Sequence, residues 1–202
     1  MQWTTKQEDA RPGRGEDRLA VIPLKDRTVF VVADGAGGVA GGAAAAENVC
    51  KAVVEQCHRD IAIVDWTRCL ANVDRQMSGS SGLAAAVVVE VRDDSSIIGA
   101  SVGDCEAWTF IDGTARNLTV EQVRKPLLGE GRARPVGFET HVNECSLVVA
   151  TGGLWKYLDR ARIAKAATLR PLDEASRTLV DSVRMKRGAL QDDVAIALIE
   201  SK

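Results

Sequence analysis

The sequence predicts an α+β sandwich whose sheets are covered by helices. Short apolar runs of strand length are joined by turns typical of hairpins. Two helical segments follow one another directly between these strands. A doubly wound parallel sheet would instead need strands and helices to alternate strictly. The order of the elements therefore favours a sandwich of hairpin-type strands with helices packed outside them.

The first half of the chain begins with a hairpin and two helices. Residues 19–24 and 28–33 are apolar runs, and the polar residues between them suit a hairpin turn. Residues 42–56 carry apolar and charged side chains with helical period, which predicts the first helix. A second helix is expected over residues 65–77, with Asp65 as its N-cap.

Three strand-like runs come next, at residues 83–91, 96–102 and 106–111. The last of them ends at an Asp-Gly pair, which is a strong hairpin signal. Residues 119–137 carry prolines and glycines among charged side chains. We expect these residues to form an irregular segment at the surface.

The last part of the chain contains two strands and two helices. Residues 146–151 are an apolar run of strand length, followed by a short helix that contains Trp155 and Tyr157. Residues 172–187 have helical periodicity and predict the last helix. Residues 194–199 predict the final strand.

Length and composition are those of an ordinary globular protein. The 202 residues fit a single domain spanning residues 1–202, which we expect to be a monomer. The formal net charge of −2 argues against a nucleic-acid partner. No apolar run is long enough to cross a bilayer, and the first residues lack the apolar core of a signal peptide, so we expect a cytoplasmic protein with no membrane partner. The five cysteines form no C-x-x-C pair and are expected to be reduced core thiols.

Carboxylates stand at the ends of four predicted strands. They are Asp34, Asp104, Asp192 with Asp193, and Asp17 with Glu16. Any one acid at a strand end is usually a solvated turn residue. If several converge on one edge of the sandwich, they form an oxygen-rich pocket of the kind that Mg²⁺ or Mn²⁺ prefers.

Six short motifs follow one another along nearly the whole chain. They are GRGEDR at 13–18, ADGAGG at 33–38, SGLAAAVVV at 81–89, VGDC at 102–105, ATGGLW at 150–155 and QDDV at 191–194. In this order they resemble the motifs of the metal-dependent type 2C Ser/Thr protein phosphatases. Each motif is weak alone, whereas six in order at compatible spacing are specific. The resemblance implies a four-layer αββα sandwich of two mainly antiparallel sheets, with a metal centre at one end.

The resemblance also implies roles for particular residues. Two or three Mg²⁺ or Mn²⁺ ions would be bound, and Asp34 would bridge two of them. The backbone carbonyl of Gly35 would ligate one ion and Asp192 the other. Asp104 would belong to a weaker third position, and Asp17 would orient bound water without touching the ions.

The implied reaction is the hydrolysis of phosphoserine or phosphothreonine by a metal-activated water. The implied partner is a phosphorylated protein, either a Ser/Thr kinase or its target, in bacterial signalling. The family's phosphate-binding arginine falls at Pro12 here, so Arg14 or Arg11 is the candidate, and we choose Arg14. A solvated surface arginine is the simpler interpretation of each. The segment at 119–137 would be a short flap with little specificity for the sequence around the phosphoresidue.

The pattern breaks at Gly152, where the family has an aspartate that ligates metal. Glycine offers no side-chain oxygen, so one cation should be held less firmly. Three explanations stay open: a substitution introduced to impair the enzyme, a catalytically silent pseudo-phosphatase that binds a phosphoprotein, or activity that persists at high metal concentration. We expect Gly152→Asp to raise Mn²⁺-dependent hydrolysis of p-nitrophenyl phosphate.

Other polar residues favour structural roles. His58 and His141 are isolated from every acidic motif, and surface positions are expected for both. Lys156, Arg160 and Arg162 predict a basic cluster on a solvated helix face.

Overall fold

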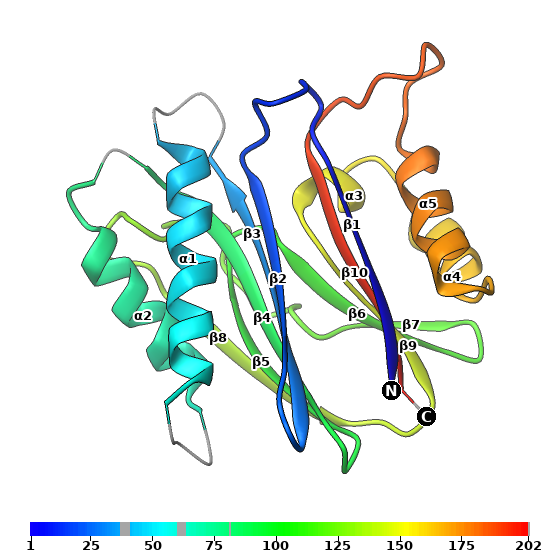
Figure 1. Cartoon of the computed structure of the whole chain (residues 1–202), viewed down its shortest axis with the longest axis horizontal. Coiled ribbons are helices and arrows are strands. Elements are labelled where there is room, and N and C mark those ends of the chain that lie inside the picture. The colour runs from blue at the N-terminus through cyan, green and yellow to red at the C-terminus, as the bar shows by residue number, and fades with distance from the viewer. Residues whose placement is uncertain (37–40, 60–63, 81, 202) are drawn as a thin grey trace.

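Two five-stranded sheets pack face to face, and helices cover the outer face of each (Figure 1). The computed structural model describes residues 1–36, 41–59, 64–80 and 82–201. Every pair of neighbouring named strands is antiparallel. The expected four-layer αββα sandwich is confirmed. Within the described ranges, no helix is long and apolar enough to span a bilayer.

One sheet has the strand order β2-β3-β4-β5-β8. Its strands are β2 (Asp17–Pro23), β3 (Arg27–Gly35), β4 (Ala84–Arg92), β5 (Ser96–Val102) and β8 (Val136–His141). The helices on its outer face are α1 (Gly42–Cys57) and α2 (Trp66–Met77). The apolar period of α1 turns Val49 and Val53 into the layer between helix and sheet. Asp65 caps α2 as predicted, because its carboxylate accepts a hydrogen bond from the Arg68 backbone N–H at 3.0 Å.

The other sheet has the strand order β1-β10-β9-β6-β7. Its strands are β1 (Gln2–Glu8), β6 (Glu106–Ile111), β7 (Thr114–Asn117), β9 (Cys145–Ala150) and β10 (Val194–Ser201). The helices that pack against it are α3 (Gly152–Trp155), α4 (Arg160–Ala167) and α5 (Leu172–Ser182). Figure 1 shows α4 and α5 on the side of the molecule opposite to α1 and α2.

Apolar side chains fill three layers, one between the sheets and one beneath each group of helices. Phe30, Leu147 and Ile199 lie in the layer between the sheets and are fully buried. Central strands such as β4 and β10 are covered on both faces, so nearly all of their residues are buried. This burial explains why these strands appear in the sequence as continuous apolar runs.

The elements that the sequence did not predict lie mostly at the edges. β1 and β8 are edge strands with alternating exposed and partly exposed residues, so their apolar signal is weak. α4 is short and was not predicted as a separate helix. The last predicted helix was too long, because α5 ends at Ser182 and a turn joins the Gly188 N–H to the Met185 carbonyl.

The segment before β8 is better anchored than an irregular surface excursion would be. Leu128 is fully buried and exchanges two backbone hydrogen bonds of 3.0 Å with Ala84. Asp74 of α2 is also buried, and its carboxylate accepts hydrogen bonds of 2.8–2.9 Å from three backbone N–H groups within residues 129–133. The predicted flap is therefore attached both to α2 and to the start of β4.

The cysteines and histidines lie where the sequence predicted them. All five cysteines are buried and free, which confirms their interpretation as core thiols. His58 and His141 are both exposed.

Candidate metal centre

The β2–β3 hairpin brings two carboxylates to one edge of its sheet. In the antiparallel register Asp17 pairs with Asp34. At the following residue, Gly35, a Cβ would lie 2.4 Å from the backbone of Gly42 at the start of α1. Because glycine alone permits this close approach, α1 begins directly beside the acidic end of β3.

A glycine turn after β5 adds a third carboxylate, that of Asp104. Gly103 has a φ of +92°, a backbone conformation that side chains rarely adopt. A Cβ at Gly103 would also lie 2.4 Å from the Cβ of Ala85, which neighbours Asp34 across the β3–β4 ladder. The turn therefore depends on glycine, and Asp104 follows it directly.

The two aspartates before β10 have different roles. The Asp193 carboxylate accepts hydrogen bonds from the backbone N–H groups of Ala10 and Glu16, both at 2.7 Å. Its oxygens are thus used to hold the segment that leads into β2. The Asp192 side chain is 42% exposed and available to the site.

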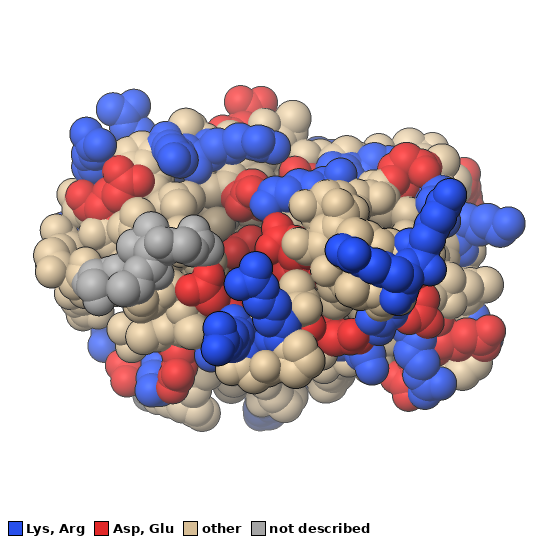
Figure 2. Space-filling model, turned by 90° about the horizontal axis from the view of Figure 1, so that it is seen from above, with Lys and Arg blue, Asp and Glu red and all other residues tan. Residues whose placement is uncertain are grey.

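These strand ends surround a cavity of about 280 Å³. Its lining residues are Glu16, Asp34, Gly35, Ala36, Ala85, Asp104, Leu127, Lys156, Asp192 and Asp193. Figure 2 looks down on this end of the molecule and shows acidic side chains grouped near the middle, with lysine and arginine side chains around them. The predicted ligands Asp34, Gly35, Asp104 and Asp192 therefore share one cavity, whereas Asp17 lies buried below it.

The buried carboxylates repel one another. Burial and the neighbouring Asp34 raise the pKa of Asp17 to about 8. Burial and Asp104 raise the pKa of Asp34 to about 7, although Lys156 opposes this shift. The Thr151 hydroxyl donates a hydrogen bond of 2.7 Å to Asp17 and favours its charged form, but less strongly than burial disfavours it. Both carboxyl groups thus favour their neutral form, because nearby protein groups offset the cost of a buried negative charge only in part.

Lys156 was expected on a solvated helix face, and its side chain is exposed. The sequence did not predict that its ammonium lies 3.4 Å from both the Asp104 and the Asp192 carboxylates. Burial lowers its pKa, but the attraction of Asp104 and Asp192 is stronger in sum and raises it. The short helix α3 carries Lys156 directly after its last residue, one helical turn beyond Gly152. This four-residue spacing is the signal that could have linked the lysine to the missing ligand.

The chemistry of the donor set fits a hard divalent cation. The cavity offers carboxylate and carbonyl oxygens, and the nearby Cys105 stays a neutral thiol because burial raises its pKa well above the ordinary value. Within the described residues, no three His, Cys, Asp or Glu side chains are grouped closely enough to hold an ion as they stand. Several of the carboxylates have other partners instead, such as Lys156 for Asp104 and Asp192.

Other predicted residues lie outside the cavity. Arg14 is exposed in the turn before β2, and its side chain does not line the cavity as the described residues form it. Arg160 is not part of a solvated basic cluster, because its guanidinium lies over the rings of both Trp108 and Trp155, 4.6 and 4.7 Å from their centroids. Arg162 is exposed as expected. Of the predicted motif residues, those at 37, 38 and 81 lie outside the described ranges.

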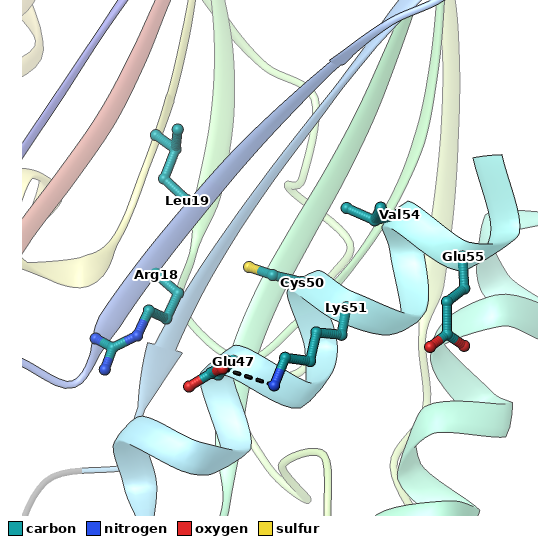
Figure 3. Close-up of a pocket in the computed structure, with 7 residues that line it drawn as sticks. All are labelled: Arg18, Leu19, Glu47, Cys50, Lys51, Val54 and Glu55. Atoms are coloured by element: carbon teal, nitrogen blue, oxygen red, sulfur yellow. Dashed lines mark ion pairs between the residues drawn. The ribbon is translucent and has the colours of Figure 1, made fainter. Parts of the chain in front are cut away.

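A second hollow of about 400 Å³ lies between β2 and α1 (Figure 3). Its main ionic groups already have partners, because Lys51 pairs with Glu47 at 2.6 Å and Arg18 binds the backbone carbonyls of Gly15 and Asp17. The hollow is larger than the acidic cavity, but it contains no comparable group of uncompensated charges. The converging carboxylates lie at the acidic end of the sandwich.

Comparison with known proteins identifies the fold. No family model matches the sequence, and no curated protein matches it. Among solved structures, a bacterial serine phosphatase is 16% identical with a TM-score of 0.88, over 100% of this chain and 98% of that chain. The catalytic domain of the phosphatase PstP in complex with 2 manganese ions is 15% identical with a TM-score of 0.76, over 100% and 98%. RsbX in complex with magnesium is 14% identical with a TM-score of 0.79, over 99% and 94%.

At these identities the likeness shows a shared fold. The chain has the fold of the bacterial Ser/Thr phosphatases over its whole length, which confirms the fold that the sequence motifs predicted.

Proposed function

We propose that this protein is a metal-dependent phosphatase that hydrolyses phosphoserine or phosphothreonine in proteins. The observation that carries the proposal is the convergence of Asp34, Asp104 and Asp192 on one cavity from separate strand ends. The shared fold supports it, as do the manganese and magnesium named with two of the similar structures. The partner would be a phosphorylated protein, either a Ser/Thr kinase or its target.

The chain's own residues would divide the work in the following way. Asp34, the Gly35 carbonyl and Asp192 would hold Mg²⁺ or Mn²⁺. Bound ions of this kind lower the pKa of water and offset charge on phosphoryl oxygens. Asp17 would orient bound water; the hydrogen bond of 2.7 Å that it accepts from the Thr151 hydroxyl supports this role, because it limits the movement of the carboxylate.

Arg14 stays the candidate for binding the substrate phosphate. It lies in the exposed turn before β2, three residues ahead of Asp17, so its guanidinium is free to meet a phosphoprotein from solvent. A charge-assisted hydrogen bond from arginine to phosphate is typically worth about 1.5–3 kcal/mol. Arg11 is the matched alternative in the same turn, to which the Arg14 backbone N–H donates at 2.9 Å.

The test is hydrolysis of a phosphothreonine peptide and of p-nitrophenyl phosphate, measured with millimolar Mn²⁺ and with EDTA. We expect turnover with Mn²⁺ that EDTA abolishes. Asp34→Asn should lower kcat/KM about 100-fold or more, because it removes a charged ligand from the centre of the site. Arg14→Ala should raise KM more than Arg11→Ala does.

Binding of the phosphopeptide without any turnover at saturating Mn²⁺ would contradict the proposal. Fluorescence anisotropy with a labelled peptide, run beside the kinetic assay on the same preparation, separates that outcome from a misfolded sample. Unchanged turnover in Asp34→Asn would contradict the assigned role of that residue.

A further inference from the structure

The Lys156 ammonium is held between two of the proposed metal ligands. Its Nζ lies 3.4 Å from Asp104 Oδ2 and 3.4 Å from Asp192 Oδ2. The two carboxylates come from different sheets, one after β5 and the other before β10. A single cation therefore joins acidic strand ends that would otherwise repel each other.

Gly152 provides the room for this ammonium. A Cβ at Gly152 would lie 2.8 Å from Lys156 Nζ, 2.9 Å from Lys156 Cε and 3.3 Å from Asp104 Oδ2. The Lys156 backbone N–H donates to the Gly152 carbonyl at 3.0 Å, so the two residues are stacked on one turn of helix. Any side chain at position 152 would therefore clash with Lys156 where it lies now, and the end of the lysine side chain would have to move.

The chain differs from the expected ligand set in two ways, the glycine at 152 and the ammonium of Lys156, and both differences occur at the same place. The side chain that the family resemblance implies at position 152 is an anion, whereas the side chain that lies in that space is the cation of Lys156. A divalent ion is bound less tightly when an anionic ligand is lost. The Lys156 ammonium does not depend on such a ligand, because its own side chain attaches it to the backbone beside the two carboxylates. The lysine thus supplies positive charge where, without an acid at 152, the remaining carboxylates have one ligand fewer to hold a divalent ion.

We propose, building on the proposed metal-dependent hydrolysis, that the Lys156 ammonium is a tethered cation that takes the place of one divalent ion between Asp104 and Asp192. The site then binds fewer ions than its carboxylates would hold without the lysine. Gly152→Asp would push the flexible end of Lys156 from its present position but leave the ammonium beside the new carboxylate. We therefore expect no additional ion in this variant and, contrary to the expectation from the sequence alone, no rise in Mn²⁺-dependent hydrolysis.

The test counts Mn²⁺ bound per chain by equilibrium dialysis with elemental analysis, and measures affinities by titration calorimetry. Lys156→Met keeps the length of the side chain and removes its charge, and it should bind one more ion than the unaltered chain. The double variant Gly152→Asp with Lys156→Met should bind that additional ion about tenfold more tightly or better, because it adds an anionic ligand. Gly152→Asp alone should bind no additional ion.

Lys165→Met is the matched control, since it removes the same charge from an exposed position on α4. Its ion count and affinities should equal those of the unaltered chain. Near-ultraviolet circular dichroism and thermal melting of each variant establish that it is folded. Equal ion counts and affinities in the unaltered chain, Lys156→Met and the double variant would overturn the inference, and so would a complete absence of Mn²⁺ binding in all of them.

Failure of the proposed function looks different. If the unaltered chain binds Mn²⁺ but does not hydrolyse phosphopeptide, the phosphatase proposal fails while the change in ion count between variants still decides the role of Lys156. If hydrolysis occurs and the ion count does not change with Lys156→Met, the phosphatase proposal stands and the tethered cation is wrong.

Discussion

The surroundings of two carboxyl groups, at the ends of β2 and β3, raise their pKa values. Asp17 is 1% exposed and faces Asp34 across the hairpin, so the charged form of each is disfavoured by burial and by its neighbours. Carboxyl groups with such perturbed pKa values occur preferentially at functional sites. In the proposed metal centre, a bound cation would favour the charged form of both groups.

We expect the free energy of unfolding of the metal-free protein to fall as the pH rises. Both carboxyl groups bind a proton more tightly in the folded chain, where their pKa values are about 8 and about 7, than in the unfolded chain. The stabilisation by protonation is complete below the ordinary value of 3.8 and is lost as the pH passes these raised values. Urea unfolding in EDTA should show a loss on the order of 5 kcal/mol between about pH 5.5 and about pH 8, with little further change above that.

Asp17→Asn serves as the control for this measurement. It keeps the shape of the side chain and the contact with Thr151 but removes the titrating group. The variant should lose much of the pH dependence, and saturating Mn²⁺ should reduce it in the unaltered chain. A pH dependence that is equal in both chains would mean that other groups cause it.

At the scale of elements, one side chain of α2 holds residues 129–133 of the flap. The Asp74 carboxylate on α2 is 3% exposed and accepts three backbone hydrogen bonds from residues 129–133. Leu127, just before this stretch, lines the acidic cavity. The position of Leu127 in the cavity lining thus depends on Asp74, although Asp74 does not itself line the cavity as the described residues form it.

Asp74→Ala should lower the free energy of unfolding by about 3 kcal/mol, because three backbone N–H groups lose a charged acceptor. Amide hydrogen exchange at residues 129–133 should become faster. Asp65→Ala is the matched control, since it removes one accepted backbone hydrogen bond at the N-cap of the same helix and should cost about 1 kcal/mol without changing exchange in the flap. Unchanged exchange in Asp74→Ala would show that other contacts hold the flap.

At the scale of the whole molecule, the site lies where the two sheets are tied together. Asp193, just before β10, holds the segment leading into β2 through the N–H groups of Ala10 and Glu16. Thr151, just after β9, donates to Asp17 in β2 and accepts from the Ala195 N–H in β10. The spacing between acids from different sheets is thus set by hydrogen bonds that cross from one sheet to the other.

Asp193→Ala should therefore affect both stability and metal binding. We expect a loss of about 3 kcal/mol in the free energy of unfolding, because two hydrogen bonds to a charged acceptor disappear. Mn²⁺ affinity measured by calorimetry should also fall, because the segment carrying Glu16 and Asp17 is released. Asp159→Ala, which removes one accepted hydrogen bond at the N-cap of α4, is the control that should leave Mn²⁺ affinity unchanged. Reduced stability with unchanged affinity in Asp193→Ala would contradict this coupling.

Much of the fold could be predicted from local patterns. The strands over 96–102 and 106–111 have the predicted bounds, and the cap at Asp65 is the predicted one. These elements are strongly periodic or fully buried, so their sequences carry a clear signal. β1 and β8 were missed because an edge strand pairs on one side only and need not be apolar.

Local patterns in the sequence determined an α+β sandwich and the order of the acids along the chain, because apolar period and glycine turns are local properties. The four-layer αββα arrangement and the missing acid at Gly152 were implied by the resemblance of the motifs to those of the type 2C phosphatases. Only the tertiary structure decided what fills that position. Lys156 meets Asp104 and Asp192 because strand ends from two sheets meet at one edge of the sandwich, and no local pattern records contacts between residues so far apart in the chain.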